Sequence, residues 1–124
     1  KRRLSVGTAL IVGPPVLVLD EPTFGQDRAR AAELLDLLSA LRADGITVIV
    51  VTHDMQLVAE YATDVVVVAD GRIRASGPTR DVFADEEMLA ETGLRLPPLQ
   101  RAFRTMPGLE HVWDLTDLRS AVTA

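Results

Sequence analysis

The sequence predicts an α/β fold in which parallel strands with flanking helices come first, followed by a β-hairpin and a helical tail. Short runs of β-branched and aliphatic residues alternate with amphipathic segments along the first half of the chain. An Asp-Gly pair then separates two further strand-like runs, which is a hairpin signal. Because strand and helix alternate before that pair, we expect a parallel sheet with right-handed crossovers.

The first half contains two predicted strands and the helix between them. Val16–Leu19 is a run of four apolar residues beside Pro14-Pro15, a pattern typical of a strand buried on both faces. Ile46–Val51 is a second β-branched run. Arg28–Asp44 reads as an amphipathic helix, with Asp27 as its N-cap and Gly45 as its stop. The leucines at the spacing of one helical face are Leu34, Leu37, Leu38 and Leu41.

The second half of the sequence is predicted to form a helix and then a β-hairpin. Two more helices follow, separated by a connector rich in prolines. The hairpin turns at Asp70-Gly71. The connector follows Gly93: Leu94–Leu99 carries two prolines, and Met106-Pro107-Gly108 adds another break. The predicted helices and strands are Met55–Ala62, Val65–Ala69, Arg72–Ala75, Pro78–Thr92 and a short helix within His111–Ala124.

The composition narrows the classes of function. The 124 residues carry a formal net charge of −5, which argues against a nucleic-acid partner. The chain has no cysteine, which excludes disulfides and thiolate metal sites. Its apolar runs are shorter than the roughly 18 residues that a membrane helix needs. The sequence does not begin with methionine, and we expect that it is a fragment of a longer protein.

Two adjacent carboxylates, Asp20 and Glu21, follow the first strand. They should lie at the carboxyl edge of the sheet, where α/β proteins bind their ligands. Phosphoryl transfer needs a metal ion and a group that orients the attacking water. Asp20 is suited to hold hydrated Mg²⁺, and Glu21 to activate water. The alternative is that both acids merely begin a solvated loop.

A histidine, His53, follows the second strand of the predicted sheet. It should reach the same edge as the two acids, where it is suited to donate a hydrogen bond to a terminal phosphate. In the alternative, Thr52 or Asp54 caps the next helix and His53 has no role.

These elements, in this order, resemble the ATPase domain of ATP-binding-cassette (ABC) proteins. Val16–Thr23 looks like the Walker B motif with its adjoining catalytic glutamate. Phe24–Asp27 sits where that family has its D-loop. Gly45–Asp54 looks like the following strand and the switch histidine, and Asp64–Ile73 like the next strand and hairpin.

The resemblance implies that residues 1–82 are the C-terminal part of a P-loop NTPase domain of the ABC type, and residues 83–124 a helical C-terminal extension. It assigns Glu21 and His53 catalytic roles. Asp20, Glu21 and His53 would contact the nucleotide, and Asp20 would hold the metal through water. The residues implied at an interface with a second ATPase domain are Gly25, Gln26 and Asp27. The implied cofactors are ATP and Mg²⁺.

Two other motifs of that family are not found in the sequence. Leu4-Ser5-Val6-Gly7-Thr8 looks like a degenerate Leu-Ser-Gly-Gly-Gln signature, but it lies within a predicted helix, Lys1–Val12, that follows the signature in the family. No Gly-x-x-x-x-Gly-Lys-Ser/Thr phosphate loop occurs in the 124 residues. We therefore expect the isolated chain to bind ATP poorly and to hydrolyse it negligibly.

Two segments narrow the branch of the family. Phe24-Gly25-Gln26-Asp27 departs from the commoner Ser-Ala-Leu-Asp and is similar to D-loops of energy-coupling-factor and cobalt-type importers. Thr92–Leu99 also looks like the region after the core domain in those subunits, although a plain connector would explain it as well. The resemblance implies uptake of a vitamin or metal ion.

The implied partners are a second ABC ATPase domain, in a homo- or heterodimer, and a transmembrane coupling subunit. The implied location is the cytoplasmic face of the cell membrane, as a peripheral protein. Two alternatives stay open. One is a non-transport ABC ATPase of DNA repair or translation, and the other is a non-catalytic remnant that only mediates association.

Overall fold

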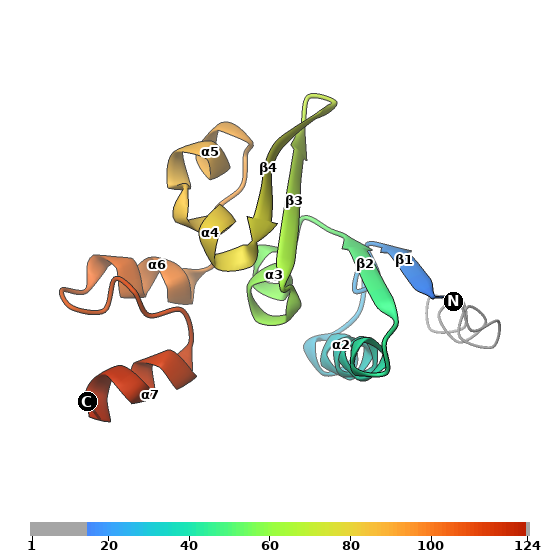
Figure 1. Cartoon of the computed structure of the whole chain (residues 1–124), viewed down its shortest axis with the longest axis horizontal. Coiled ribbons are helices and arrows are strands. Elements are labelled where there is room, and N and C mark those ends of the chain that lie inside the picture. Colours follow the sequence, from blue (N-terminus) through green and yellow to red (C-terminus); the bar gives the residue numbers. More distant parts are fainter. Residues whose placement is uncertain (1–14, 124) are drawn as a thin grey trace. The chain divides into compact units, whose positions relative to one another are not determined.

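The computed structural model describes residues 15–123 (Figure 1). The helix expected over Lys1–Val12, with the rejected signature at Leu4–Thr8, lies outside them. The described residues divide after His53 into two compact units. The domain boundary expected at residue 82 stays a prediction. The helices and strands are β1 (Val16–Asp20), α2 (Arg28–Ala43), β2 (Thr47–Val51), α3 (Met55–Tyr61), β3 (Asp64–Ala69), β4 (Arg72–Pro78), α4 (Thr79–Ala84), α5 (Glu86–Glu91), α6 (Pro98–Thr105) and α7 (Leu115–Thr123).

The first unit holds a parallel pair of strands, as the sequence predicted. β1 pairs with β2 in a register that runs from Val16 opposite Thr47 to Asp20 opposite Val51. Both strands therefore end at the same edge of the sheet. The residues that leave this edge are Glu21 after β1 and Thr52 after β2. The parallel register thus brings two segments together that are about thirty positions apart in the sequence.

Helix α2 connects the two strands, and its ends match the prediction. Asp27 caps the helix, because its side chain accepts a hydrogen bond from the Arg30 N–H at 2.9 Å. Gly45, with φ of +90°, reverses the chain in a Schellman motif. The two hydrogen bonds of that motif run from Gly45 N to Arg42 O and from Ile46 N to Leu41 O, at 3.0 and 3.1 Å.

The packing of α2 corrects the predicted helical face. Leu34, Leu35 and Leu38 are its buried residues, whereas Leu37 is 43% exposed. A helix turns about 100° per residue, so Leu35 and Leu37 flank the Leu34–Leu38 row on opposite sides, and the buried arc extends toward Leu35. Leu35 takes its place among the buried residues of α2, and Leu17 of β1 is also buried.

One face of the β1–β2 pair remains exposed in the described residues. Alternate side chains point to opposite faces of a strand, and Leu17 is buried while Val16 and Val18 are 46% and 61% exposed. On β2, Ile49 and Val51 are also exposed. The expectation that the first strand is buried on both faces is therefore wrong for the described part of the chain, where α2 supplies the covering layer on one side.

The second unit begins with α3 and the β3–β4 hairpin. The turn is the predicted Asp70-Gly71, and both residues have positive φ, of 52° and 71°. This is the conformation of a type I′ turn, which glycine adopts without strain. The register extends from Ala69 opposite Arg72 to Asp64 opposite Pro78. β4 is thus longer than the predicted Arg72–Ala75.

The single helix predicted over Pro78–Thr92 is wrong, because the chain forms two short helices there. α4 ends at Ala84 and α5 begins at Glu86. Asp85 lies between them with φ of −88° and ψ of 83°, and its side chain accepts a hydrogen bond from the Met88 N–H at 2.9 Å. An aspartate that bonds to the local backbone in this way favours a helix start over a helix interior.

A hydrophobic core joins α3, α4, α5 and the hairpin of the second unit. Phe83 is completely buried and Leu89 is 2% exposed. The partly buried Trp113 packs against this core, with its ring centroid 5.7 Å from that of Phe83. The buried members of the core are Val58, Ala59, Val67, Val82, Phe83, Met88, Leu89 and Leu96.

The tail contains one helix that the sequence did not predict. α6 begins with Pro98 at its first position and occupies part of the expected connector. Arg104 of α6 donates hydrogen bonds to the carbonyl oxygen of Phe83 and to Glu86 Oε1, both at 2.6 Å. The predicted C-terminal helix is α7. Among the described residues, no helix is both long and apolar enough to cross a membrane.

Candidate functional site

The backbone places Glu21 at the common edge of β1 and β2. Its N–H donates to the carbonyl oxygen of Val51 at 2.8 Å, which extends the parallel ladder by one residue. Glu21 itself has φ of +45°, a left-handed conformation that residues other than glycine rarely adopt. The chain turns there, and the Glu21 side chain is directed toward the residues that follow β2. Strained backbone of this kind often occurs at functional sites.

Three hydrogen bonds hold the Glu21 carboxylate. Oε1 accepts from the His53 backbone N–H at 3.2 Å and lies 2.7 Å from His53 Nδ1. Oε2 accepts from the Thr52 hydroxyl at 3.1 Å. Because the carboxylate is an acceptor, Nδ1 must carry the shared hydrogen. The Glu21 side chain is 28% exposed and that of His53 is 78% exposed, so the cluster is reachable from solvent.

These contacts favour the ionised form of Glu21. The hydrogen bond from the His53 side chain lowers the pKa of the Glu21 carboxyl below its usual range, and the Thr52 hydroxyl and the His53 charge and N–H act in the same direction. Partial desolvation opposes them. The carboxylate is therefore ionised at neutral pH and fixed in one orientation.

Asp20 lies beside this cluster in the chain but takes no part in the hydrogen bonds that join its members. It is the last residue of β1, opposite Val51, and it is exposed. No group of three or more His, Cys, Asp or Glu in the described part of the chain is suited to hold a metal ion. A single exposed carboxylate fits Mg²⁺, which keeps several waters and takes its other ligands from phosphate oxygens.

The segment after Glu21 turns and leads directly into α2. Phe24 N donates to Glu21 O and Gln26 N to Thr23 O, both at 3.2 Å. Gly25 has φ of +73°. The Gln26 amide donates to the carbonyl oxygen of Pro22 at 3.3 Å, while its Oε1 is buried without a hydrogen-bond partner in the described residues.

The structure thus brings Glu21 and His53 together, and Asp20, Gly25, Gln26 and Asp27 lie on the same segment of the chain as Glu21. Thr52 was missed as a site residue, since the sequence suggested only that it caps a helix. The cap of α3 is instead Asp54, which accepts from Gln56 N and Leu57 N. The register of the sheet is what identifies Thr52, because the ladder ends with Asp20 opposite Val51 and the next residues are Glu21 and Thr52.

Comparisons with known proteins agree with this architecture. No family model matches the chain. The chain is 50% identical over 99 residues to a Methanosarcina acetivorans protein named as a putative ABC transporter ATP-binding protein. The aligned region covers 80% of this chain and 16% of that protein. The chain is also 40% identical over 106 residues to the energy-coupling factor transporter ATP-binding protein EcfA of Methanosphaera stadtmanae. That alignment covers 86% of this chain and 38% of the EcfA protein.

A solved structure shows the same likeness in three dimensions. The cbiO1 protein of Clostridium perfringens, part of the ABC transporter complex cbiONQ, matches with a TM-score of 0.61 and 38% identity. The match covers 78% of this chain and 39% of that protein. The chain therefore spans well under half the length of these relatives. It is homologous to part of the ATP-binding proteins of ABC transporters, and its fold is that of part of an ABC ATPase domain.

Proposed function

We propose that this chain is the C-terminal part of the ATP-binding subunit of an ABC importer, which couples ATP hydrolysis to uptake of a vitamin or a metal ion. The observation that carries the proposal is the Glu21 carboxylate, fixed by His53 and Thr52 where β1 and β2 end. The relatives named as energy-coupling factor ATP-binding proteins support the importer class.

In this proposal Glu21 is the group that orients and deprotonates the attacking water. Its lowered pKa keeps it ionised at neutral pH, so it is ready to accept a hydrogen bond from water. Both carboxylate oxygens already accept hydrogen bonds, from Thr52 and His53. The carboxylate is therefore oriented before water binds, and little further conformational entropy is lost in the reaction. Asp20 would hold Mg²⁺ through water, and this ion would supply charge neutralisation at the phosphates.

His53 contributes to the phosphate side of the reaction. Its Nδ1–H donates to Glu21, and in neutral histidine this tautomer leaves Nε2 as an acceptor. Donation to a γ-phosphate oxygen therefore requires either the doubly protonated ring or release of Glu21. His53 is exposed enough for either change. The same ring thus positions Glu21 before nucleotide arrives and contacts the phosphate afterwards.

The segment Gly25–Asp27 is proposed to contact a second ABC ATPase domain, in a homo- or heterodimer. At one end of this segment, the Gln26 amide donates a hydrogen bond to the carbonyl oxygen of Pro22, next to Glu21. At the other end, Asp27 caps α2. A transmembrane coupling subunit is the further partner, and the assembled protein would lie at the cytoplasmic face of the membrane.

We also infer that the isolated chain is inactive, because its 124 residues lack the phosphate loop that grips ATP. The test uses a chimaera of the Methanosphaera stadtmanae EcfA protein, in which the aligned segment is replaced by this chain. We expect ATP turnover by the chimaera and none by the purified chain. If the purified chain hydrolyses ATP and Glu21→Gln abolishes this activity, the inference that the isolated chain is inactive is wrong. If the chimaera folds but does not hydrolyse ATP, the proposed function is wrong.

A further inference from the structure

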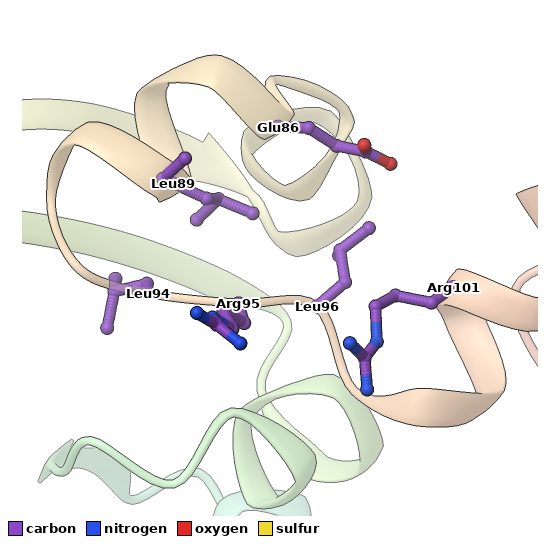
Figure 2. Close-up of a pocket in the computed structure, with 7 residues that line it drawn as sticks. Glu86, Leu89, Leu94, Arg95, Leu96 and Arg101 are labelled. Atoms are coloured by element: carbon purple, nitrogen blue, oxygen red, sulfur yellow. The ribbon is translucent and has the colours of Figure 1, made fainter.

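A hollow of about 260 Å³ lies in the second unit, between α5 and the start of α6 (Figure 2). Its apolar part is made by leucines that are partly or wholly buried, and its rim carries charged side chains. The residues labelled in Figure 2 are Glu86, Leu89, Leu94, Arg95, Leu96 and Arg101.

The hollow arises from the way α5 ends. The chain reverses after α5, with hydrogen bonds from Gly93 N to Ala90 O and from Leu94 N to Leu89 O at 3.1 and 2.8 Å. This Schellman motif sets Leu94 beside Leu89. The chain then runs to Pro98, where α6 begins, and Leu96 joins the core with 5% of its surface exposed. The apolar floor is therefore anchored in the core of the unit.

Two arginines beside this floor have no partner among residues 15–123. In the described part of the chain, the Arg95 and Arg101 guanidinium groups make no hydrogen bond or ion pair, and both residues are exposed. Arg104 differs, because it is bonded to Glu86 Oε1 at 2.6 Å. That ion pair neutralises the one carboxylate in the lining, so the hollow has an uncompensated positive rim.

A second hollow adjoins the first. Its volume is about 630 Å³, and it shares Glu86 and Arg101 with the first hollow. Arg104, Thr105 and Glu110 extend its lining along α6 and beyond. We call the two adjoining hollows, which share Glu86 and Arg101, the α5–α6 groove.

The shape of the groove favours a peptide over a small molecule. Sites for small ligands bury about 70–90% of the ligand surface, whereas Glu86, Arg95 and Arg101 are exposed and both hollows open to solvent. An extended segment can instead place one apolar side chain in a pocket and run on along the groove. Arginine beside an apolar pocket is also a common centre of binding energy between proteins.

We propose that the α5–α6 groove binds an extended segment of a partner protein in which an apolar side chain stands next to Asp or Glu. The apolar side chain occupies the floor formed by Leu89, Leu94 and Leu96. The carboxylate lies at the rim and bonds to Arg95 and Arg101, each of which offers the planar pair of donors that suits a carboxylate. This inference does not depend on nucleotide binding.

The test is selection from a phage-displayed library of random peptides on the 124-residue chain. We expect enrichment of sequences with Asp or Glu beside Leu, Ile or Phe. The double variant Arg95→Gln with Arg101→Gln should bind the selected peptide at least about tenfold more weakly. Arg72→Gln is the matched control, because Arg72 is exposed and lies outside both hollows, and its affinity should match that of the wild type.

Three results would overturn the proposal. One is a selection that yields no such motif. Another is a selected peptide that binds the double variant as tightly as the wild type, while NMR spectra show both proteins folded. The third is displacement of the selected peptide by hexanoate at a concentration equal to that of the peptide. That result would show that the groove is a site for small organic anions.

Discussion

The two units differ in where their apolar side chains lie. The first unit buries a few leucines between α2 and one face of β1–β2, and the other face of the sheet stays exposed in the described residues. The second unit has a closed core around Phe83, to which the tail is tied by Trp113 and Arg104. Parallel sheets are normally covered on both faces. The comparison indicates that the second unit is the more stable one, whereas the candidate chemistry lies on the less covered one.

The largest expected effect is in the second unit. Phe83→Ala should lower its free energy of unfolding by about 3–5 kcal/mol, because the ring is completely buried and packs against Trp113. Urea unfolding followed by circular dichroism measures this loss. Val66→Ala is the control, since Val66 is exposed and should cost little. Similar losses in the two variants would contradict the assignment of the core.

A smaller effect is expected at the start of α2. Asp27→Ala should destabilise the first unit by about 1 kcal/mol through loss of the N-cap, and Asp27→Asn should not, because asparagine also caps helices. In the EcfA chimaera, both variants should weaken cooperative turnover more than binding of the first nucleotide, if the charge acts at an interface. Equal, modest effects on binding and turnover would count against that role.

The smallest effect is on the Glu21 carboxyl itself. His53→Ala should raise the pKa of Glu21 toward its usual range, and Thr52→Val should raise it by less, because the His53 side chain is the larger cause of the lowering. Carbon NMR of the Glu21 carboxyl measures both values. Thr52→Ser keeps the hydroxyl and is the control.

The same pKa predicts a pH dependence of stability. A carboxyl whose pKa is lowered on folding stabilises the folded state above its unfolded pKa of about 4.3, and this contribution disappears as the pH falls through the folded value. The stability difference between wild type and His53→Ala should therefore shrink below about pH 4. The difference should be small, because the pair is partly exposed. A difference that grows in acid would contradict the His53–Glu21 contact.

Local signals in the sequence predicted much of the fold. The caps of α2, the Asp70-Gly71 turn and the parallel strands all follow from residue type and spacing. The break at Asp85 and the helix after Pro98 were missed, because an aspartate inside an amphipathic pattern and a pair of prolines each permit two structures. Tertiary contacts choose between them, such as the bonds from Arg104 to Phe83 and Glu86.

Only part of the candidate site could be predicted, again because local sequence signals do not specify tertiary contacts. Glu21 and His53 were expected at one edge because they follow parallel strands, and the structure brings them to 2.7 Å. The contact of Thr52 with Glu21 depends on the exact register of β1 and β2 and on the left-handed backbone of Glu21. A single sequence specifies neither of these.

The most direct test of the proposed chemistry is Glu21→Gln in the EcfA chimaera, with ATP binding and ATP turnover measured on the same preparation. Glutamine keeps the shape of the side chain and can still bond to Thr52, but it cannot accept a proton from water. We expect ATP binding to be retained while turnover falls by about 10²–10⁴-fold. Turnover within about twofold of the unsubstituted chimaera would contradict it.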